Sequence, residues 1–293
     1  MRLIILLVFF IQLYPARGMD GNQLSAFALK KSSFQEDRGH LRPTHIADIP
    51  DKLVYVKIDQ GFSYSRLLDQ GMSNLHYAGP GAMLSVARFV DADSYFSEWV
   101  FARGGLHFSL PQHEGTLVYN SSFGMSYAHL RKLRSRGVFD YAAGGQLNVF
   151  AHMRLAPALS NSYLHVDMIG SIMPRFDAST TIFLFEREWH FDFTFSLGLL
   201  GYAWRIPEYG ATFQIGTDGS ETLTNNEVMT LHPGNYAHLV TGVFYKNGFG
   251  GRQNPNRYRI GYVWDYHAIK GSHGLNKYNA MHQLVLELFF RVN

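Results

Sequence analysis

The sequence contains no cysteine and few charged residues. The first absence excludes disulfide frameworks, thiolate metal sites and cysteine nucleophiles. The charged fraction of 17% lies below the roughly 25% of ordinary soluble domains. Like charges never run to five or six residues, and 26 basic against 23 acidic residues leave a net charge of +3. Nucleic acid is therefore not expected as a partner.

After residue 18 the sequence also lacks any apolar run of the roughly 20 residues that a transmembrane helix needs. The long apolar stretch lies at the start, where Arg2 precedes residues 3–11 and Ala16-Arg17-Gly18 follows them. Basic, apolar and small-residue regions in this order predict a signal peptide over 1–18, cleaved near Gly18. An uncleaved membrane anchor is the alternative. Residues 19–52 show no periodicity and are predicted to form a flexible polar periplasmic leader.

What the chain does have is aromatic residues, at 15% of 293, and strict alternation of apolar and polar residues from position 53 onward. In 139–155, for example, Leu147 and Val149 share one parity while Gln146 and Asn148 share the other. Alternation predicts β-strands with one apolar and one polar face. A soluble sandwich has such strands too, but they usually hold about 5–6 residues. The patterned segments here run to about 12–17 residues, with Tyr and Trp near their ends.

Together with the signal peptide, this pattern resembles the class of bacterial outer-membrane β-barrels. The resemblance implies a single all-β, antiparallel transmembrane barrel over residues 53–293 in the outer membrane of a Gram-negative bacterium, with outer-membrane lipid around it and periplasmic termini. We count about ten strands, with eight to twelve possible, and interpret residues 283–293 as the closing strand. The ten predicted strands are 53–68, 81–90, 95–110, 116–130, 139–155, 163–176, 182–206, 236–247, 256–269 and 279–292.

Residues 182–206 are predicted as one long strand because their aromatic residues share one parity, which a two-residue turn would reverse. The longest connection, 207–235, is then extracellular, as expected of such barrels. This loop and the leader are the candidate surfaces for a surface or periplasmic protein partner.

Polar residues on the inward parity predict a lumen of mixed charge, which side chains largely fill in a barrel this narrow. The function expected is therefore structural, binding or small-solute channel (porin-like), with a filled lumen or a narrow pore as the two alternatives and no cofactor. The residues predicted to face the lumen are Arg103, Asp140, Gln146, Asn148, His152, His165, Asp167, His190, Asp192, Arg257, Arg259, Asp265, His267, Glu287 and Arg291.

An outer-membrane hydrolase is the alternative function. His107 and Ser109 lie two apart on one strand, which puts both on the same face, as activation of a nucleophile by a base requires. Asn120 faces inward from the next strand. The arrangement resembles the His-x-Ser of outer-membrane phospholipases and lipid A deacylases, although Leu110-Pro111 follows here in place of their Ser-Asn.

A second hydrolase alternative is a protease. Asp91-Ala92-Asp93 and Asp265-Tyr266-His267 match the spacing of the Asp-x-Asp and Asp-x-His of omptin proteases. The predicted topology puts these two motifs near opposite ends of the barrel, which argues against a shared activated water.

Two further patterns have structural and functional interpretations. His152, His165 and His190 lie on neighbouring strands and could converge, yet their spacing lacks the usual ligand pattern, so no metal site is expected. Arg257 and Arg259 could bind an anion or pair with Glu287 on the neighbouring strand.

Overall fold

A computed structural model describes residues 52–70, 72–111, 117–133, 138–158, 164–184, 187–205, 225–230, 236–245, 256–269 and 276–292. The predicted signal peptide and nearly all of the predicted leader lie outside these residues. The chain divides into Met1–Pro50 and Asp51–Asn293, and only the second unit is described below.

Regular structure in the described residues consists of β-strands, as the alternating pattern predicts. None of these residues belongs to a helix long and apolar enough to cross a membrane. The strands are β1 (Lys52–Asp69), β2 (Ser73–Ala92), β3 (Tyr95–Pro111), β4 (Val118–Lys132), β5 (Phe139–Leu155), β6 (Leu164–Leu184), β7 (Arg187–Leu197), β8 (Leu200–Arg205), β9 (Asn225–Thr230), β10 (Tyr236–Tyr245), β11 (Arg257–Ile269) and β12 (Lys277–Arg291).

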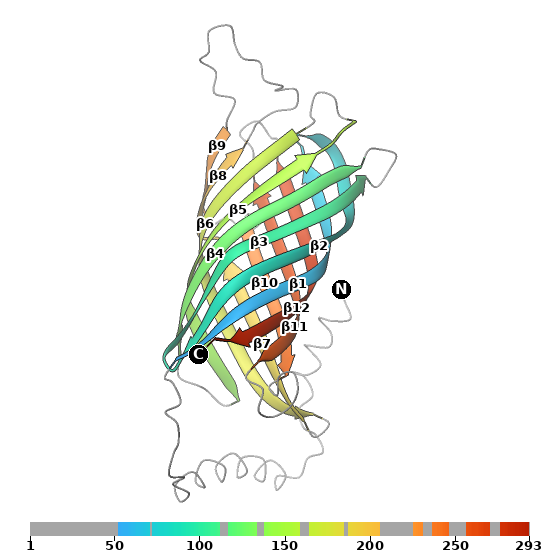
Figure 1. The fold of residues 1–293 in the computed structure, drawn as a ribbon. Helices are drawn as coiled ribbons and strands as arrows, with labels where there is room; N and C mark the ends of the chain where they lie inside the picture. Colours follow the sequence, from blue (N-terminus) through green and yellow to red (C-terminus); the bar gives the residue numbers. More distant parts are fainter. Residues whose placement is uncertain are drawn as a thin grey trace, which may run out of the picture. The chain divides into compact units, whose positions relative to one another are not determined.

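The strands form one antiparallel sheet that closes into a barrel (Figure 1). Closure depends on two pairings, because β1 bonds to β12 as well as to β2, and β5 bonds to β6. β7 and β8 both pair with β6, one after the other along its length, so together they fill one place in the ring. β10 pairs with β7 and β9 pairs with β8, so β9 and β10 together fill the next place. Because two places are each filled by two strands, the twelve strands occupy ten places in the ring. The predicted all-β antiparallel barrel of about ten strands is confirmed.

The predicted strand 182–206 is wrong at its start. β6 continues to Leu184, which pairs directly with Arg187 across a two-residue connection. Aromatic residues on both sides of this turn share a parity in the sequence, and that coincidence hid the turn. A second irregularity follows, because Gly198 and Leu199 separate β7 from β8 and shift the register by one residue. Such a β-bulge reverses which parity faces outward, so Phe195 and Tyr202 are both exposed.

Two other predicted boundaries change. The predicted loop 207–235 contains β9, which pairs with β8; residues 207–224 and 231–235 lie outside the described residues. β2 begins eight residues earlier than predicted, and Gly79-Pro80-Gly81 lies within the strand. Proline lacks a backbone donor, and the register of β2 with β3 accordingly skips positions 79 and 80.

The barrel has two ends that the strand directions define. At the end where β1 starts and β12 finishes, here called the terminal end, Tyr55 pairs with Arg291. At the opposite end, called the far end, Asp69 pairs with Lys277. The turn between β2 and β3 lies at the terminal end, since Lys52 pairs with Ala92.

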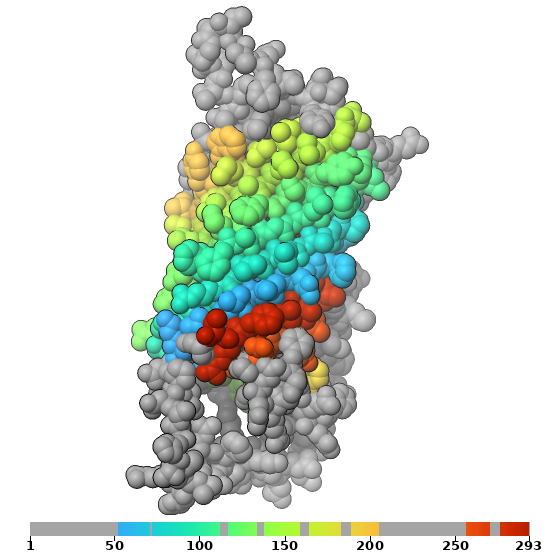
Figure 2. All heavy atoms as spheres, viewed as in Figure 1, coloured from blue at the N-terminus to red at the C-terminus, as the bar shows by residue number. Residues whose placement is uncertain are grey.

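The outside of the barrel is apolar and exposed. Phe62 is 80% exposed, Leu284 59% and Leu84 56%, and similar residues occur on strands around the ring. Figure 2 shows one such outer face over β12 and β1–β4. The inward positions of the same strands hold polar and charged residues that are buried. Soluble monomers rarely expose large apolar patches, whereas apolar-out and polar-in is the pattern of a barrel that spans a lipid bilayer.

Candidate functional site

The polar lumen is the candidate site, and most residues predicted to face it do line the interior. Gln146, His152, His165, Asp167, His267 and Glu287 are buried. Arg103, Asn148, His190, Asp192, Arg257, Arg259 and Asp265 are half-buried. Asp140 and Arg291 share the inward register, but each is exposed at a strand end on the terminal side. These two predicted lumen residues therefore lie at the rim.

Near the terminal end, Lys57 is the centre of a buried ion-pair network, here called the terminal network. Its Nζ lies 3.2 Å from Asp59 Oδ2 on the same strand and 4.0 Å from Glu287 Oε1 on β12. It also pairs with Glu98 of β3, across the intervening strand β2. Asp59 in turn accepts a hydrogen bond from Ser85 Oγ at 2.6 Å.

The terminal network continues to the opposite wall through two arginines. Arg175 of β6 binds Glu98 at 3.0 Å and Asp177 at 3.0 Å. Arg259 of β11 pairs with Glu287, as the structural interpretation of the sequence predicted, and lies 3.5 Å from Asp192. Together with Lys57, these ion pairs join six strands that are not all neighbours: β1, β3, β6, β7, β11 and β12.

Toward the far end, four buried side chains form a second ion-pair cluster, called the far network. Arg154 of β5 is 0% exposed. Its guanidinium lies 2.6 Å from Asp167 of β6 and 2.9 Å from Asp69 of β1. Lys277 of β12 pairs with the same Asp167. Because a buried charge is costly unless paired, the far network holds strands from two sides of the ring together.

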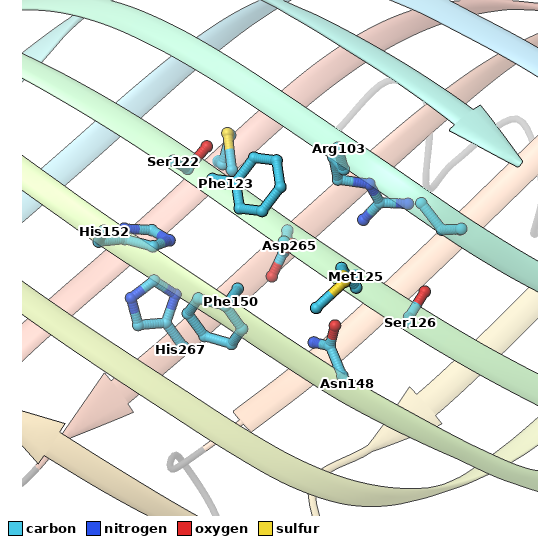
Figure 3. Close-up of a pocket in the computed structure, with 13 residues that line it drawn as sticks. Arg103, Ser122, Phe123, Met125, Ser126, Asn148, Phe150, His152, Asp265 and His267 are labelled. Atoms are coloured by element: carbon cyan, nitrogen blue, oxygen red, sulfur yellow. The ribbon is translucent and has the colours of Figure 1, made fainter.

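Between the two networks lies a small cavity, shown in Figure 3, to which Arg103 and Asp265 contribute side chains. A β-bulge at Phe101 and Ala102 precedes Arg103 and turns it inward. His152 and His267 form the wall near Phe150, with their ring centroids 4.7 Å apart and nearly perpendicular. Among the described residues, neither Arg103 nor Asp265 makes an ion pair. The space suffices for a few water molecules.

The remaining sequence candidates for binding do not assemble. In the described part of the chain, no three His, Asp or Glu side chains are placed to hold a metal ion. His190 bonds to Thr181 near the terminal end, 2.8 Å away, whereas His165 lies near the far end. Arg257 stacks over the Tyr55 ring, 5.3 Å from its centroid, while Arg259 is tied to Glu287.

The candidate nucleophile and base are also held apart. His107 Nε2 bonds to Ser63 Oγ at 2.8 Å, and Ser109 Oγ lies 3.4 Å from Ser65 Oγ. Both contacts pass over β2, where Gly81 lies in register between Ser63 and His107. His107, Ser109 and Asn120 are all buried. His107 and Ser109 are packed polar side chains that bridge β3 to β1, and Asn120 lies opposite His107 on β4.

The candidate protease motifs lie near opposite ends of the barrel, as the sequence predicted. Asp91 is in register with Leu53 at the start of β1. His267 aligns, through Asn279, with Leu67 near the end of β1. Fourteen residues of strand, or about 45 Å, separate these levels. A water shared by the two motifs is thereby excluded.

Sequence reasoning missed several members of the networks. Lys57 and Glu98 were not among the predicted lumen residues, nor were Asp69 and Lys277. Glu98 precedes the β-bulge, so its parity is opposite to that of Arg103 on the same strand. Asp69 and Lys277 end or begin strands, where alternation gives little signal. Phe150 has the same even parity on β5 as Gln146 and His152, and this pattern could have identified it as a lumen residue.

Comparisons with known proteins give no family. No family model matches the sequence, and no curated protein matches it. Solved structures with a similar fold include the outer membrane protease OmpT from Escherichia coli, at 9% identity and TM-score 0.42, with 85% of this chain and 99% of that chain covered. The translocator domain of the autotransporter NalP from Neisseria meningitidis is similar at 8% identity and TM-score 0.36, with 92% of this chain and 98% of that chain covered.

An outer membrane channel from Pseudomonas putida F1 is also similar, at 9% identity and TM-score 0.29, with 85% of this chain and 100% of that chain covered. These structures are outer-membrane β-barrels, but they include a protease, a translocator and a channel. Their likeness to this chain distinguishes none of the functions. The lumen must be interpreted from its own contacts.

Proposed function

We propose that this protein is a bacterial outer-membrane β-barrel whose lumen is closed by its own ion-paired side chains, and that it has a structural or binding function. The observation that carries the proposal is the far network, in which Arg154, Asp167 and Lys277 are almost completely buried. A water-filled pore would leave such charges exposed to solvent. Two buried networks at different levels leave no wide path between the ends.

The size of the ring supports the same conclusion. Barrels of about eight strands have interiors just wide enough for side chains to fill, whereas general porins with a water-filled channel use 16–18. Ten strand places put this barrel near the lower limit. Bulky inward residues occupy the interior: Arg175 on β6 reaches Glu98 three places away in the ring, and Arg259 on β11 reaches Asp192 two places away.

A closed barrel leaves its rims and connections as the surfaces available to other molecules. The predicted extracellular segment around β9 and the predicted periplasmic leader are where we place a protein partner. Loops carried on a rigid scaffold are common recognition surfaces. The lipid bilayer itself contacts the apolar outer face.

Conductance in planar bilayers tests the proposal. The purified full-length protein is expected to insert without regular current steps. A double variant, Lys57→Ser with Arg154→Ser, removes one cation from each network and should produce steps if it folds, as the heat-modifiable gel shift would show. Arg88→Ser with Arg131→Ser removes two exposed arginines from the outward parity and is the matched control. Regular steps from the wild type would overturn the closed-lumen proposal.

A small-solute channel is the second candidate, favoured by the cavity between the networks. Arg103 and Asp265 face this cavity without ion-pair partners among the described residues. A cation and an anion at the same level would give weak charge selection. Wild-type current steps that Arg103→Gln alters would support this candidate.

A further inference from the structure

The outer face of the barrel carries a basic patch where β1, β2, β11 and β12 approach the far end. In one cross-strand row, Tyr64 lies opposite His282, which lies opposite Trp264. In the next row toward the far end, Arg66 lies opposite Ala280, which lies opposite Tyr266. We call Arg66, His282 and Tyr64, with Ala280 between them, the outer basic patch.

Polarity changes sharply along β1 at this patch. Phe62 is 80% exposed and Tyr64 44% exposed, and the next outward residue is the exposed Arg66. Four residues of strand cover about 13 Å. On β12 the outward residues change in the same direction from the apolar Leu284 to the polar His282. Aromatic girdles mark the two bilayer interfaces of membrane barrels, so this patch lies at the level of lipid headgroups.

The guanidinium of Arg66 has no partner of opposite charge in the described residues. Its cross-strand neighbours are Ala78 and Ala280, whose short side chains leave open space on both sides. The outward positions of the described β1, β2, β11 and β12 hold no Asp or Glu. Arg66 is therefore a cation on an apolar surface with no carboxylate beside it among the described residues of these four strands.

The second donor of the patch, His282, is held in place. Tyr262 Oη and His282 Nδ1 are 2.5 Å apart, and the two rings lie 6.1 Å between centroids. This bond uses Nδ1 and leaves Nε2 as the ring nitrogen able to donate to a ligand. His76, exposed on β2 opposite Leu68, adds a third basic group within two positions of Arg66.

We propose that the outer basic patch binds the phosphate of a lipid headgroup, with Arg66 and His282 as donors and the acyl chains on the apolar surface around Phe62 and Leu284. Arginine forms paired, charge-assisted hydrogen bonds with phosphate oxygens. The gap over Ala280 accepts the headgroup between the Arg66 guanidinium and the His282 Nε2–H donor. Trp264 and Tyr64 flank it at the interface. The inference rests on the proposed membrane-spanning barrel.

Native mass spectrometry of the full-length protein in detergent tests this site. The probes are diphosphorylated lipid A, phosphatidylglycerol, dioleoylglycerol and inorganic phosphate. The wild type should retain one phospholipid or lipid A molecule and no dioleoylglycerol. Arg66→Gln should weaken retention about tenfold, the loss of one charge-assisted contact. Arg66→Lys should keep part of the affinity, because the charge remains.

Arg88→Gln is the matched control, because Arg88 is also exposed on the outside but lies opposite Val56 and Trp99 near the terminal end. Its lipid retention should equal that of the wild type. Equal retention by Arg66→Gln and wild type, or equal binding of dioleoylglycerol, would overturn the site. Competition by inorganic phosphate would assign the patch to free anions and overturn the lipid proposal. The closed-lumen proposal is tested separately by conductance, so the two can fail independently.

Discussion

Ser63 Oγ and His107 Nε2 lie 2.8 Å apart although a complete strand, β2, runs between β1 and β3. The bond is possible because Gly81 occupies the intervening register position and has no side chain. A Cβ at Gly81 would lie 2.4 Å from His107 Cδ2 and 2.4 Å from Leu106 O. The absence of one methyl group thus allows strands that are not neighbours to contact each other.

Gly81→Ala should therefore destabilise the barrel by about 1–3 kcal/mol, the usual cost of overpacking. The free energy of unfolding by urea in lipid vesicles measures it. Gly145→Ala is the matched control, because a Cβ there meets nothing within 4 Å. Equal stabilities of the two variants would contradict the placement of His107 over β2.

Arg154→Ala should be more destabilising, by about 3–5 kcal/mol, because it leaves the buried Asp69 and Asp167 without their shared cation. The same unfolding measurement applies. Lys132→Ala breaks an ion pair of similar length with Asp91 whose side chains are 37% and 31% exposed. That control should change stability by less than about 1 kcal/mol. Comparable losses of unfolding free energy in Arg154→Ala and Lys132→Ala would refute a buried far network.

Phe62→Arg distinguishes a lipid-facing surface from a water-facing one. At 80% exposure, Phe62 makes few protein contacts, and a charged replacement would be harmless in water. In a bilayer it should cost up to about 2–4 kcal/mol, depending on depth. Folding yield into vesicles, read from the heat-modifiable gel shift, is the measurement. Lys52→Gln, at the exposed start of β1, serves as control. Unchanged folding of Phe62→Arg would argue against membrane insertion.

Lipid hydrolysis is not expected from this chain. His107 and Ser109 bond to Ser63 and Ser65, not to each other, and both are buried. Incubation of the wild type with phospholipid vesicles should release no fatty acid beyond that from Ser109→Ala. Release that depends on Ser109 would restore the hydrolase interpretation.

Alternation in the sequence predicts the inside and outside of this barrel well because a strand's side chains have a period of two. It fails at β-bulges, where one extra residue reverses the parity. Glu98 was missed for this reason, since the bulge at Phe101 and Ala102 separates it from Arg103. The turn between Leu184 and Arg187 was missed because matching parities on both sides imitated one strand.

The ion-pair partners could not be predicted from the pattern of single strands. Lys57 binds Glu98 across an intervening strand, and Arg154 reaches Asp69 from the other side of the ring. Such contacts depend on barrel closure and on small residues such as Ala87, which lies opposite Lys57 on β2. Ion pairs between adjacent strands can be predicted from the sequence, and the pair of Arg259 with Glu287 was one of the predicted alternatives.

The bond between β1 and β12 has a consequence for how the protein is made. Gln70 and Asn276, at the far end of this seam, bond to each other although 206 residues separate them in the sequence. Contacts between such distant residues form slowly. The seam cannot close until the last strand has been synthesised. Until then the edge of β1 that pairs with β12 stays unpaired, and unpaired strand edges are prone to aggregation.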